Sequence, residues 1–176
     1  PTMAVAVGDS VRKGQVLFSD KKTEGVVFTS PISGTVVEIN RGAKRAFIGL
    51  VIEAAGDEAE SFSRYDATQL EVLDRTTVIE QLLSSGAWAA LRTRPFSRIP
   101  SPQSAPNSIF VTAMDTNPLA ADPKPIIASK EVEFSAGLSV LSRLTDGAVH
   151  LCQDSSSALN ASNHDSVVNH VFEGPH

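Results

Sequence analysis

The chain is poor in the residues that cross-link secreted proteins or anchor proteins in membranes. Its one cysteine, Cys152, excludes an internal disulfide and fits a reducing compartment. No apolar run approaches the ~20 residues needed to cross a bilayer, and no secretory signal is present. The net charge of −5 leaves no basic surplus, which argues against a general nucleic-acid binder.

The remaining composition is that of an ordinary soluble protein. Hydrophobic residues make up 41% of the 176 positions and charged residues 20%, enough for one or two domains with a buried core. Because the chain opens on Pro1 rather than Met and stops at "FEGPH", we expect it to be a fragment of a longer polypeptide.

Residues 1–60 have the pattern of a small β domain. Short alternating runs follow one another at close spacing and are separated by glycine-containing turns: "MAVAVGDSVRKGQVLF", "GVVFTS", "GTVVEI" and "AFIGLVIE". Such runs predict a small sandwich or barrel. We therefore place a first domain at residues 1–60, with a fold like that of lipoyl and biotinyl carriers (a barrel-sandwich hybrid).

A carrier domain of this type needs an acceptor lysine at the tip of a tight hairpin. The hairpin expected here has its tip in "SDKKTEG", residues 19–25, which holds Lys21 and Lys22. Neither lysine lies in the Met-Lys-Met of biotin carriers or the Asp-Lys-Ala of lipoyl carriers. Surface lysines are common in turns, so we expect a carrier-like fold without carrier chemistry.

Residues 61–176 change to a mixed α/β pattern. A helix is expected in "RTTVIEQLLSSGAWAAL", with a capping box at Thr77 and Glu80 and an end at Gly86. Its apolar stripe consists of Val78, Ile79, Leu82 and Leu83. The following stretch, "RTRPFSRIPSPQSAPNS", is rich in Pro and Ser and predicts an irregular loop.

The end of the chain predicts strands around one helix. "SIFVTAM", "AVHLC" and "SVVNHVF" are strand candidates, and the helix candidate between the first two begins at Ser129 as N-cap and ends at Gly147. Its expected apolar side consists of Val132, Leu138, Leu141 and Leu144. Strand, helix and strand in this order favour a βαβ unit on a parallel sheet.

Three arginines lie close together in the loop after the first helix. Arg92, Arg94 and Arg98 fall within seven residues, and guanidinium groups suit phosphates. They could hold a nucleotide by side chains alone. The favoured alternative is that they pair with acids of this chain or of a partner, because phosphate pockets usually recruit backbone donors as well.

Histidines recur near the end of the chain at positions that match no familiar zinc pattern. His164, His170 and His176 are spaced six residues apart, and with Cys152 they could be imagined as metal ligands. Ordinary core or surface histidines are favoured, so we predict no metal site. Cys152 lies in an apolar strand candidate and is expected to be a small buried hydrophobe.

Several stretches together resemble the A-type component of the bacterial sodium-translocating NADH:quinone oxidoreductase. They are "VRKGQVLFSDKK", "GVVFTSPISG", "ALRTRPFSRIP", "FVTAMDTNPLAADP", "LSVLSRLT" and "FEGPH". The resemblance implies a peripheral subunit on the cytoplasmic side of the bacterial inner membrane. It also implies a complex that uses NAD, flavins, iron-sulfur centres and ubiquinone in other subunits, with those subunits as partners and quinone as a possible one.

The same resemblance implies an architecture similar to the flavin-binding subunit of respiratory complex I. There, "SGLRGRGGAGF" forms a glycine-rich loop against the flavin phosphate; here the matching stretch is "SGAWAALRTRPF", residues 85–96, with no glycine after Gly86. A second segment, "NADEGEP", is matched by "TAMDTNP", residues 112–118, where both glutamates are gone and Asp115 remains. We therefore expect residues 61–176 to be part of a flavin-domain-like fold, truncated, without a flavin site.

The expected role is that of a scaffold and docking subunit that binds no cofactor and has no catalytic residue of its own. The tentative ligand-facing or partner-facing residues are Arg92, Arg94, Phe96, Asp115 and Asn117. A quinone- or flavin-binding redox module of the same complex is the first alternative. A lipoyl-type carrier domain, modified on Lys21 or Lys22, is the second.

Overall fold

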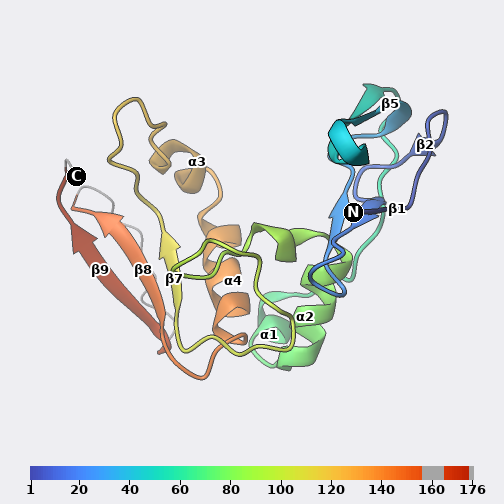
Figure 1. The fold of residues 1–176 in the computed structure, drawn as a ribbon. Coiled ribbons are helices and arrows are strands. Elements are labelled where there is room, and N and C mark those ends of the chain that lie inside the picture. The colour runs from blue at the N-terminus through green and yellow to red at the C-terminus, as the bar shows by residue number, and fades with distance from the viewer. Residues whose placement is uncertain (156–164, 175–176) are drawn as a thin grey trace. The chain divides into compact units, whose positions relative to one another are not determined.

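The computed structural model describes residues 1–155 and 165–174 (Figure 1). The chain divides into two compact units, and each is built from two separate stretches of sequence. The first unit consists of Pro1–Arg64 and Ile79–Ser104, and the second of Tyr65–Val78 and Ala105–His176. Each described helix is too short or too polar to cross a bilayer.

Two small antiparallel sheets form the body of the first unit. One has the order β1 (Thr2–Met3), β3 (Val16–Ser19), β4 (Val27–Thr29), and the other the order β2 (Ser10–Val11), β5 (Gly34–Arg41), β6 (Phe47–Ala54). A short 3-10 helix, η1 (Ala43–Arg45), joins β5 to β6. The alternating apolar residues bury Val5, Val11, Leu17 and Val36 as the core. The sequence prediction of short strands in residues 1–60 is confirmed.

One glycine is required where β5 begins. Gly34 is buried beside β6, and a Cβ atom built on it would lie 2.1 Å from the carbonyl oxygen of Glu53. No side chain fits at that distance, so the pairing of β5 with β6 depends on the missing side chain.

The first two α-helices start at aspartates. α1 (Ala67–Leu70) is capped by Asp66, which forms a reciprocal capping box with Gln69. α2 (Arg75–Ser84) is capped by Asp74, whose carboxylate accepts from the backbone N–H of Thr77 at 2.9 Å. The predicted capping box at Thr77 is therefore wrong, because Asp74 provides the stronger acceptor one turn earlier.

The predicted helix end near Gly86 is confirmed. α2 stops at Ser84, and Gly86 adopts a left-handed φ of 78° before the 3-10 helix η2 (Ala87–Ala90). The N–H of Gly86 donates to the carbonyl of Leu83, which is one of the helix's last carbonyls.

A three-stranded parallel sheet is the centre of the second unit. Its order is β7 (Ile109–Thr112), β8 (Val149–Asp154), β9 (Val167–Phe172). α3 (Lys124–Ala128) and α4 (Glu131–Ser142) connect β7 to β8, and the sheet and its helices are seen in Figure 1. The predicted strand–helix–strand order and the parallel sheet are confirmed.

One face of this sheet packs on α4. The buried residues at the contact are Ala113, Leu138, Val149 and Leu151, flanked by Ile109, Val111, Ile127, Phe134, Leu141 and Val167. The predicted apolar side of the helix is right for Leu138 and Leu141 and wrong for Val132, which is 81% exposed. Phe134 packs in its place, because α4 presents the face two residues farther on.

The predicted ends of the same helix are also wrong. Ser129 ends α3 rather than starting α4, whose first flanking residue is Lys130. α4 ends at Ser142, well before Gly147. Gly147 has another reason to be glycine: a Cβ atom there would lie 2.0 Å from the carbonyl oxygen of Asn107.

Candidate functional site

The arginine-rich loop is fastened at its base by the one tryptophan of the chain. Trp88 in η2 is buried, and its Nε1–H donates to the carbonyl oxygen of Pro100 at 2.9 Å. This bond joins the two ends of the loop across twelve residues. Because the indole is buried and its one donor is satisfied, the base is held by both packing and hydrogen bonding.

The tip of the loop is closed by its own backbone. Thr93 N–H donates to the carbonyl of Arg98 at 2.8 Å, and Ser97 N–H donates to the carbonyl of Thr93 at 2.8 Å. The Thr93 hydroxyl also donates to the carbonyl of Arg98. Phe96 lies within this turn and is 74% exposed. The loop is therefore a braced turn that presents an aromatic ring to its surroundings.

The three arginines of the loop have different surroundings. The Arg92 guanidinium donates to the carbonyls of Ala89 and Leu91, so it completes the end of η2. The Arg98 guanidinium lies 5.7 Å from the centre of the Phe96 ring, within cation–π range.

Arg94 is exposed at the same tip. Within residues 1–155 and 165–174, none of the three arginines forms an ion pair. The favoured pairing with acids of this chain is therefore not seen there, while pairing with a partner stays a prediction.

The backbone donors of residues 85–96 are largely used inside the loop. Gly86 N–H donates to Leu83, and Ala89 N–H donates to Gly86. Leu91 N–H donates to Trp88, Thr93 N–H is used as described, and Pro95 has no N–H. A Cβ atom on Gly86 would lie 2.8 Å from Thr29 Oγ1, so its open side is already filled. A phosphate cradle needs converging free N–H groups, and this stretch has few to offer.

The other two candidate residues lie in the second unit. Asp115 and Asn117 follow β7, at the carboxyl edge of the parallel sheet, where ligands of α/β proteins commonly bind. Asp115 Oδ1 accepts from the Asn117 backbone N–H at 2.9 Å and from its side-chain amide at 2.8 Å. The pair forms a local Asx turn, which already satisfies one carboxylate oxygen.

An ion pair that the sequence analysis did not find lies at the same edge. Lys124 Nζ, at the start of α3, lies 2.9 Å from Asp154 Oδ2 at the end of β8. The hydrogen bond to Asp154 raises the pKa of Lys124. The pair joins the end of a strand to a helix that precedes it in the chain, which is a structural role.

The hairpin tip of the first unit is placed as predicted. β3 and β4 pair antiparallel, and Lys21 and Lys22 lie exposed in the turn between them. Lys22 N–H donates to the Asp20 carboxylate at 2.9 Å, a bond typical of a turn. The absence of a prosthetic group on either lysine stays a prediction.

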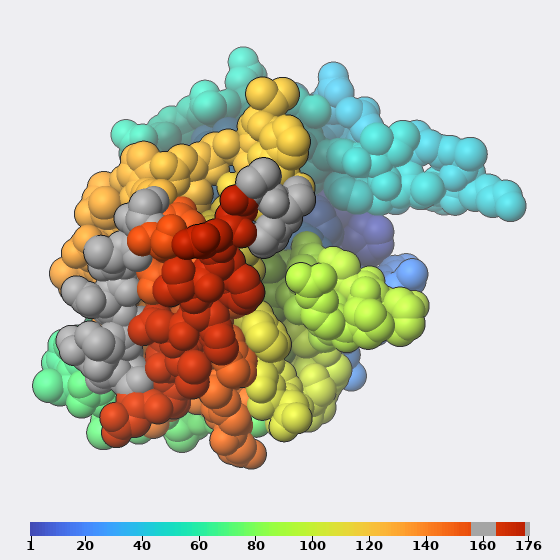
Figure 2. Space-filling view, turned by 90° about the vertical axis from the view of Figure 1, so that its left-hand side faces the viewer, coloured from blue at the N-terminus to red at the C-terminus, as the bar shows by residue number. Residues whose placement is uncertain are grey.

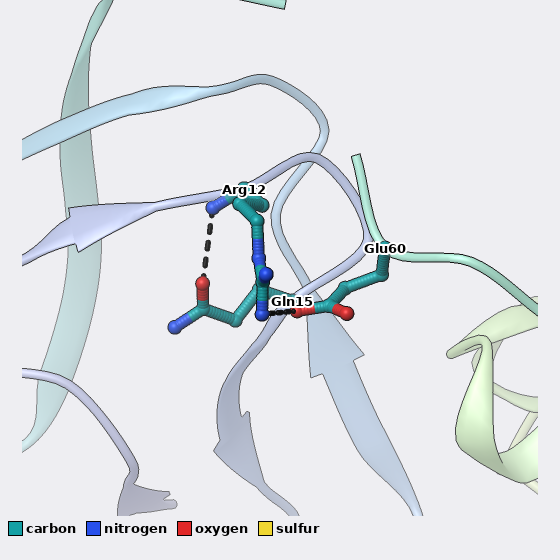
Figure 3. Close-up of polar contacts among 3 residues, drawn as sticks. All are labelled: Arg12, Gln15 and Glu60. Atoms are coloured by element: carbon teal, nitrogen blue, oxygen red, sulfur yellow. Dashed lines mark hydrogen bonds and ion pairs between the residues drawn. The ribbon is translucent and has the colours of Figure 1, made fainter. Parts of the chain in front are cut away.

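An open hollow of about 550 Å³ lies at the end of the sheet of β2, β5 and β6. At its rim, Arg12 Nη2 lies 2.6 Å from Glu60 Oε1, while Arg12 N–H donates to Gln15 Oε1 at 3.0 Å (Figure 3). Lys13 N–H donates to the carbonyl of Glu58, so these contacts hold residues 58–60 against the strand ends. The residue separation of Arg12 and Glu60 gave no sequence signal for this pairing.

Glu58 and Ser33 line the same hollow. The Ser33 hydroxyl donates to Glu58 Oε2 at 2.9 Å. A hydrogen bond from its own backbone N–H and then that of Ser33 lower the pKa of Glu58, so the carboxylate stays ionised at neutral pH. A carboxylate and an ion-paired guanidinium at one rim favour neither anions nor cations, so the hollow indicates no ligand class.

Two histidines meet on the parallel sheet. His150 Nδ1 and His170 Nε2 lie 2.8 Å apart, although the residues are twenty positions apart in sequence. Cys152 is partly buried, and burial raises the pKa of its thiol, as expected for an unreactive cysteine. His164 and His176 lie outside the described residues. Among the described residues, no group of three or more His, Cys, Asp or Glu side chains is placed to hold a metal ion.

Comparison with known proteins decides the family. Residues 1–55 match the NqrA N-terminal barrel-sandwich hybrid domain, and residues 73–176 match the NqrA second alpha/beta domain. The chain belongs to the NqrA family. The predicted barrel-sandwich hybrid followed by an α/β domain is thereby confirmed.

Relatives that are named as the A component of the Na(+)-translocating NADH-quinone reductase match the NqrA chain over all its 176 residues. The identity is 58% for Vibrio atlanticus (strain LGP32), 56% for Vibrio anguillarum and 56% for Klebsiella pneumoniae (strain 342). In each case the chain spans 39% of the relative's length. The relatives are named as subunits of an oxidoreductase, which confirms the expected class. The relation to the flavin-binding subunit of complex I stays a prediction.

Proposed function

We propose that this NqrA chain is a docking and scaffold part of a sodium-translocating NADH-quinone reductase. Its family and its 58% identity to a Vibrio NqrA relative support the assignment to that complex. In this proposal the chain lies peripherally on the cytoplasmic side of the inner membrane, with other subunits as partners. NAD, flavins, iron-sulfur centres and ubiquinone belong to those partners.

The observation that carries the docking role is the exposed ring of Phe96 on a braced turn. A turn closed by its own hydrogen bonds and fastened by Trp88 loses little conformational freedom on binding, which favours affinity. Aromatic and arginine side chains are enriched among the residues that dominate interface energies. Phe96 with Arg94 and Arg98 would fit a partner surface that has an apolar pocket with acidic residues around it.

The same region argues against a flavin role. The backbone donors of residues 85–96 are largely satisfied internally, and the Arg92 guanidinium is occupied by backbone carbonyls. A flavin phosphate would have to be held by Arg94 and Arg98 alone, without the backbone groups that phosphate sites usually use. We therefore propose that the chain binds no cofactor.

The test is assembly of the complex around an NqrA polypeptide that carries Arg94→Ala and Phe96→Ala. We expect at least a tenfold loss of the other subunits on affinity purification through tagged NqrA. The matched control is Lys44→Ala with Ile48→Ala, which also removes one exposed cation and one exposed apolar side chain from the first unit. Normal assembly of the first variant would refute the docking role.

The cofactor part of the proposal has a separate measurement. We expect the purified complete subunit to show no visible absorption band. A flavin spectrum that is lost in an Arg94→Ala variant would establish the redox-module alternative in place of the scaffold.

A further inference from the structure

The parallel sheet of the second unit has two unlike faces. One face packs on α4 through the core residues given above. Because side chains alternate along a strand, the residues between them point to the opposite face. This opposite face is formed by Phe110 and Thr112 of β7, His150, Cys152 and Asp154 of β8, and Val168, His170 and Phe172 of β9.

Aromatic rings form a continuous row across this opposite face. Phe110 stacks on His150 with ring centres 4.8 Å apart, and His150 lies 5.0 Å from His170. The ring of Phe172 follows at 6.4 Å from His170. Four rings from three strands therefore make one apolar strip with an imidazole pair at its centre.

The strip is open to solvent at both ends. Phe110 is 65% exposed and Phe172 is 43% exposed. No helix or strand of the described residues packs on this face. In Figure 2 the atoms of β9, in red, lie at the front of the view.

An all-parallel sheet with one open face is unusual. Such sheets occur almost only with both faces covered, because the strands are apolar on both sides. Burying two phenylalanine rings and a valine would contribute several kcal/mol at ~25 cal/mol per Å². The open face therefore calls for a cover that the described residues do not supply.

The length of the relatives indicates where the cover comes from. The chain spans 39% of each curated relative, so more than half of each relative's length lies outside the match. A segment of the same polypeptide reaches this face without the entropic cost of association between separate molecules.

We infer that this sheet face is an intrachain docking surface, covered by a segment of the complete subunit outside residues 1–176. The segment presents apolar side chains to Phe110 and Phe172. It also presents a hydrogen-bonding group between them, because each imidazole of the His150–His170 pair has a second ring nitrogen that would otherwise be buried without a partner. The inference is independent of the role of the Phe96 loop.

Photo-crosslinking in the assembled complex identifies the cover directly. p-Benzoyl-phenylalanine replaces Phe110 in the complete subunit, and mass spectrometry identifies the peptide to which it links. We expect a peptide of the same subunit from outside residues 1–176. A peptide from within residues 1–176, a peptide from another subunit, or no crosslinked peptide would each overturn the inference.

The same reagent at Phe96 is the matched control. It tests the proposed docking role, for which a peptide of another subunit is expected. The two positions can succeed or fail separately, so failure of one proposal is not confused with failure of the other.

A second measurement uses the unaltered complete subunit, isolated from its partners. Hydroxyl-radical oxidation is followed at Phe110 and Phe172, with Phe96 as the exposed reference. We expect both sheet residues to be oxidised at least fivefold more slowly than Phe96. Oxidation of all three at similar rates would contradict a cover that belongs to the subunit itself.

Discussion

Trp88 donates its indole N–H to the carbonyl oxygen of Pro100, and this bond joins both ends of the arginine-rich loop. We expect Trp88→Phe to lower the free energy of unfolding by about 1–3 kcal/mol, because a partly buried carbonyl loses its donor and the smaller ring leaves a gap. Urea unfolding followed by circular dichroism measures the change. Phe96→Leu in the same loop is the control and should stay within about 0.5 kcal/mol, since Phe96 is exposed. Equal effects of the two variants would mean that Trp88 does not fasten the loop.

Gly34 lies against the carbonyl of Glu53, where a Cβ atom would approach to 2.1 Å. We expect Gly34→Ala to cost more than about 2 kcal/mol of unfolding free energy, because β5 must move away from β6. Gly49→Ala in β6 is the matched control: a Cβ atom there has open space, so the cost should stay below about 1 kcal/mol. The comparison is made by the same unfolding experiment, and similar costs would contradict the close approach.

Asp74 gives α2 a pH-dependent cap. Hydrogen bonds from the Thr77 backbone and then the Thr77 hydroxyl lower its pKa from the ordinary value of 3.8. A carboxyl whose pKa is lowered by folding stabilises the fold above its ordinary pKa, and that stabilisation is lost as the pH falls through the folded pKa. We expect Asp74→Asn to be less stable than the unchanged chain at neutral pH, with a difference that shrinks below pH 3.8.

Thermal unfolding of both proteins at a series of pH values checks this expectation. Asp57→Asn, which lies outside the helices, is the control for the loss of one negative charge. A stability difference for Asp74→Asn that is constant down to the most acidic pH would contradict an ionised cap.

Lys21 and Lys22 lie at a carrier-like hairpin tip, but we expect neither to be modified. Intact mass spectrometry of the complete subunit purified from its bacterium should give the mass of the unmodified polypeptide. Digestion then locates any adduct. A lipoyl or biotinyl group on either lysine would establish the carrier alternative, and Lys44 serves as an exposed lysine of the same unit that lies outside the hairpin tip.

The sequence predicted the strands and the parallel sheet because their signals are local. Alternating apolar residues and glycine turns mark residues 1–60, and short apolar runs mark β7, β8 and β9. Element ends were less predictable. Ser129 is a good N-cap residue in isolation, but the chain uses it to end α3, and the packing of Phe134 on the sheet sets the face of α4.

The site residues illustrate the same limit. Arg92, Arg94 and Arg98 look equivalent in sequence, and only the fold shows that Arg92 is occupied by the carbonyls of η2. The His150–His170 pair was missed because its two members meet through strand register. A search for histidines at helical or zinc-finger spacing cannot find a contact of that kind.

The interleaving of the two units limits how the gene can be divided. A fragment that ends at residue 64 keeps both small sheets but lacks Ile79–Ser104, and a fragment that starts at residue 105 lacks Tyr65–Val78. Every cut between these points removes part of one unit from its own sequence. The barrel-sandwich hybrid therefore cannot be exchanged between proteins as a cassette of residues 1–60, and recombination within this stretch would separate Thr29 from Ser85, whose carbonyl accepts its hydroxyl. Exchange by recombination should preserve residues 1–104 as a block.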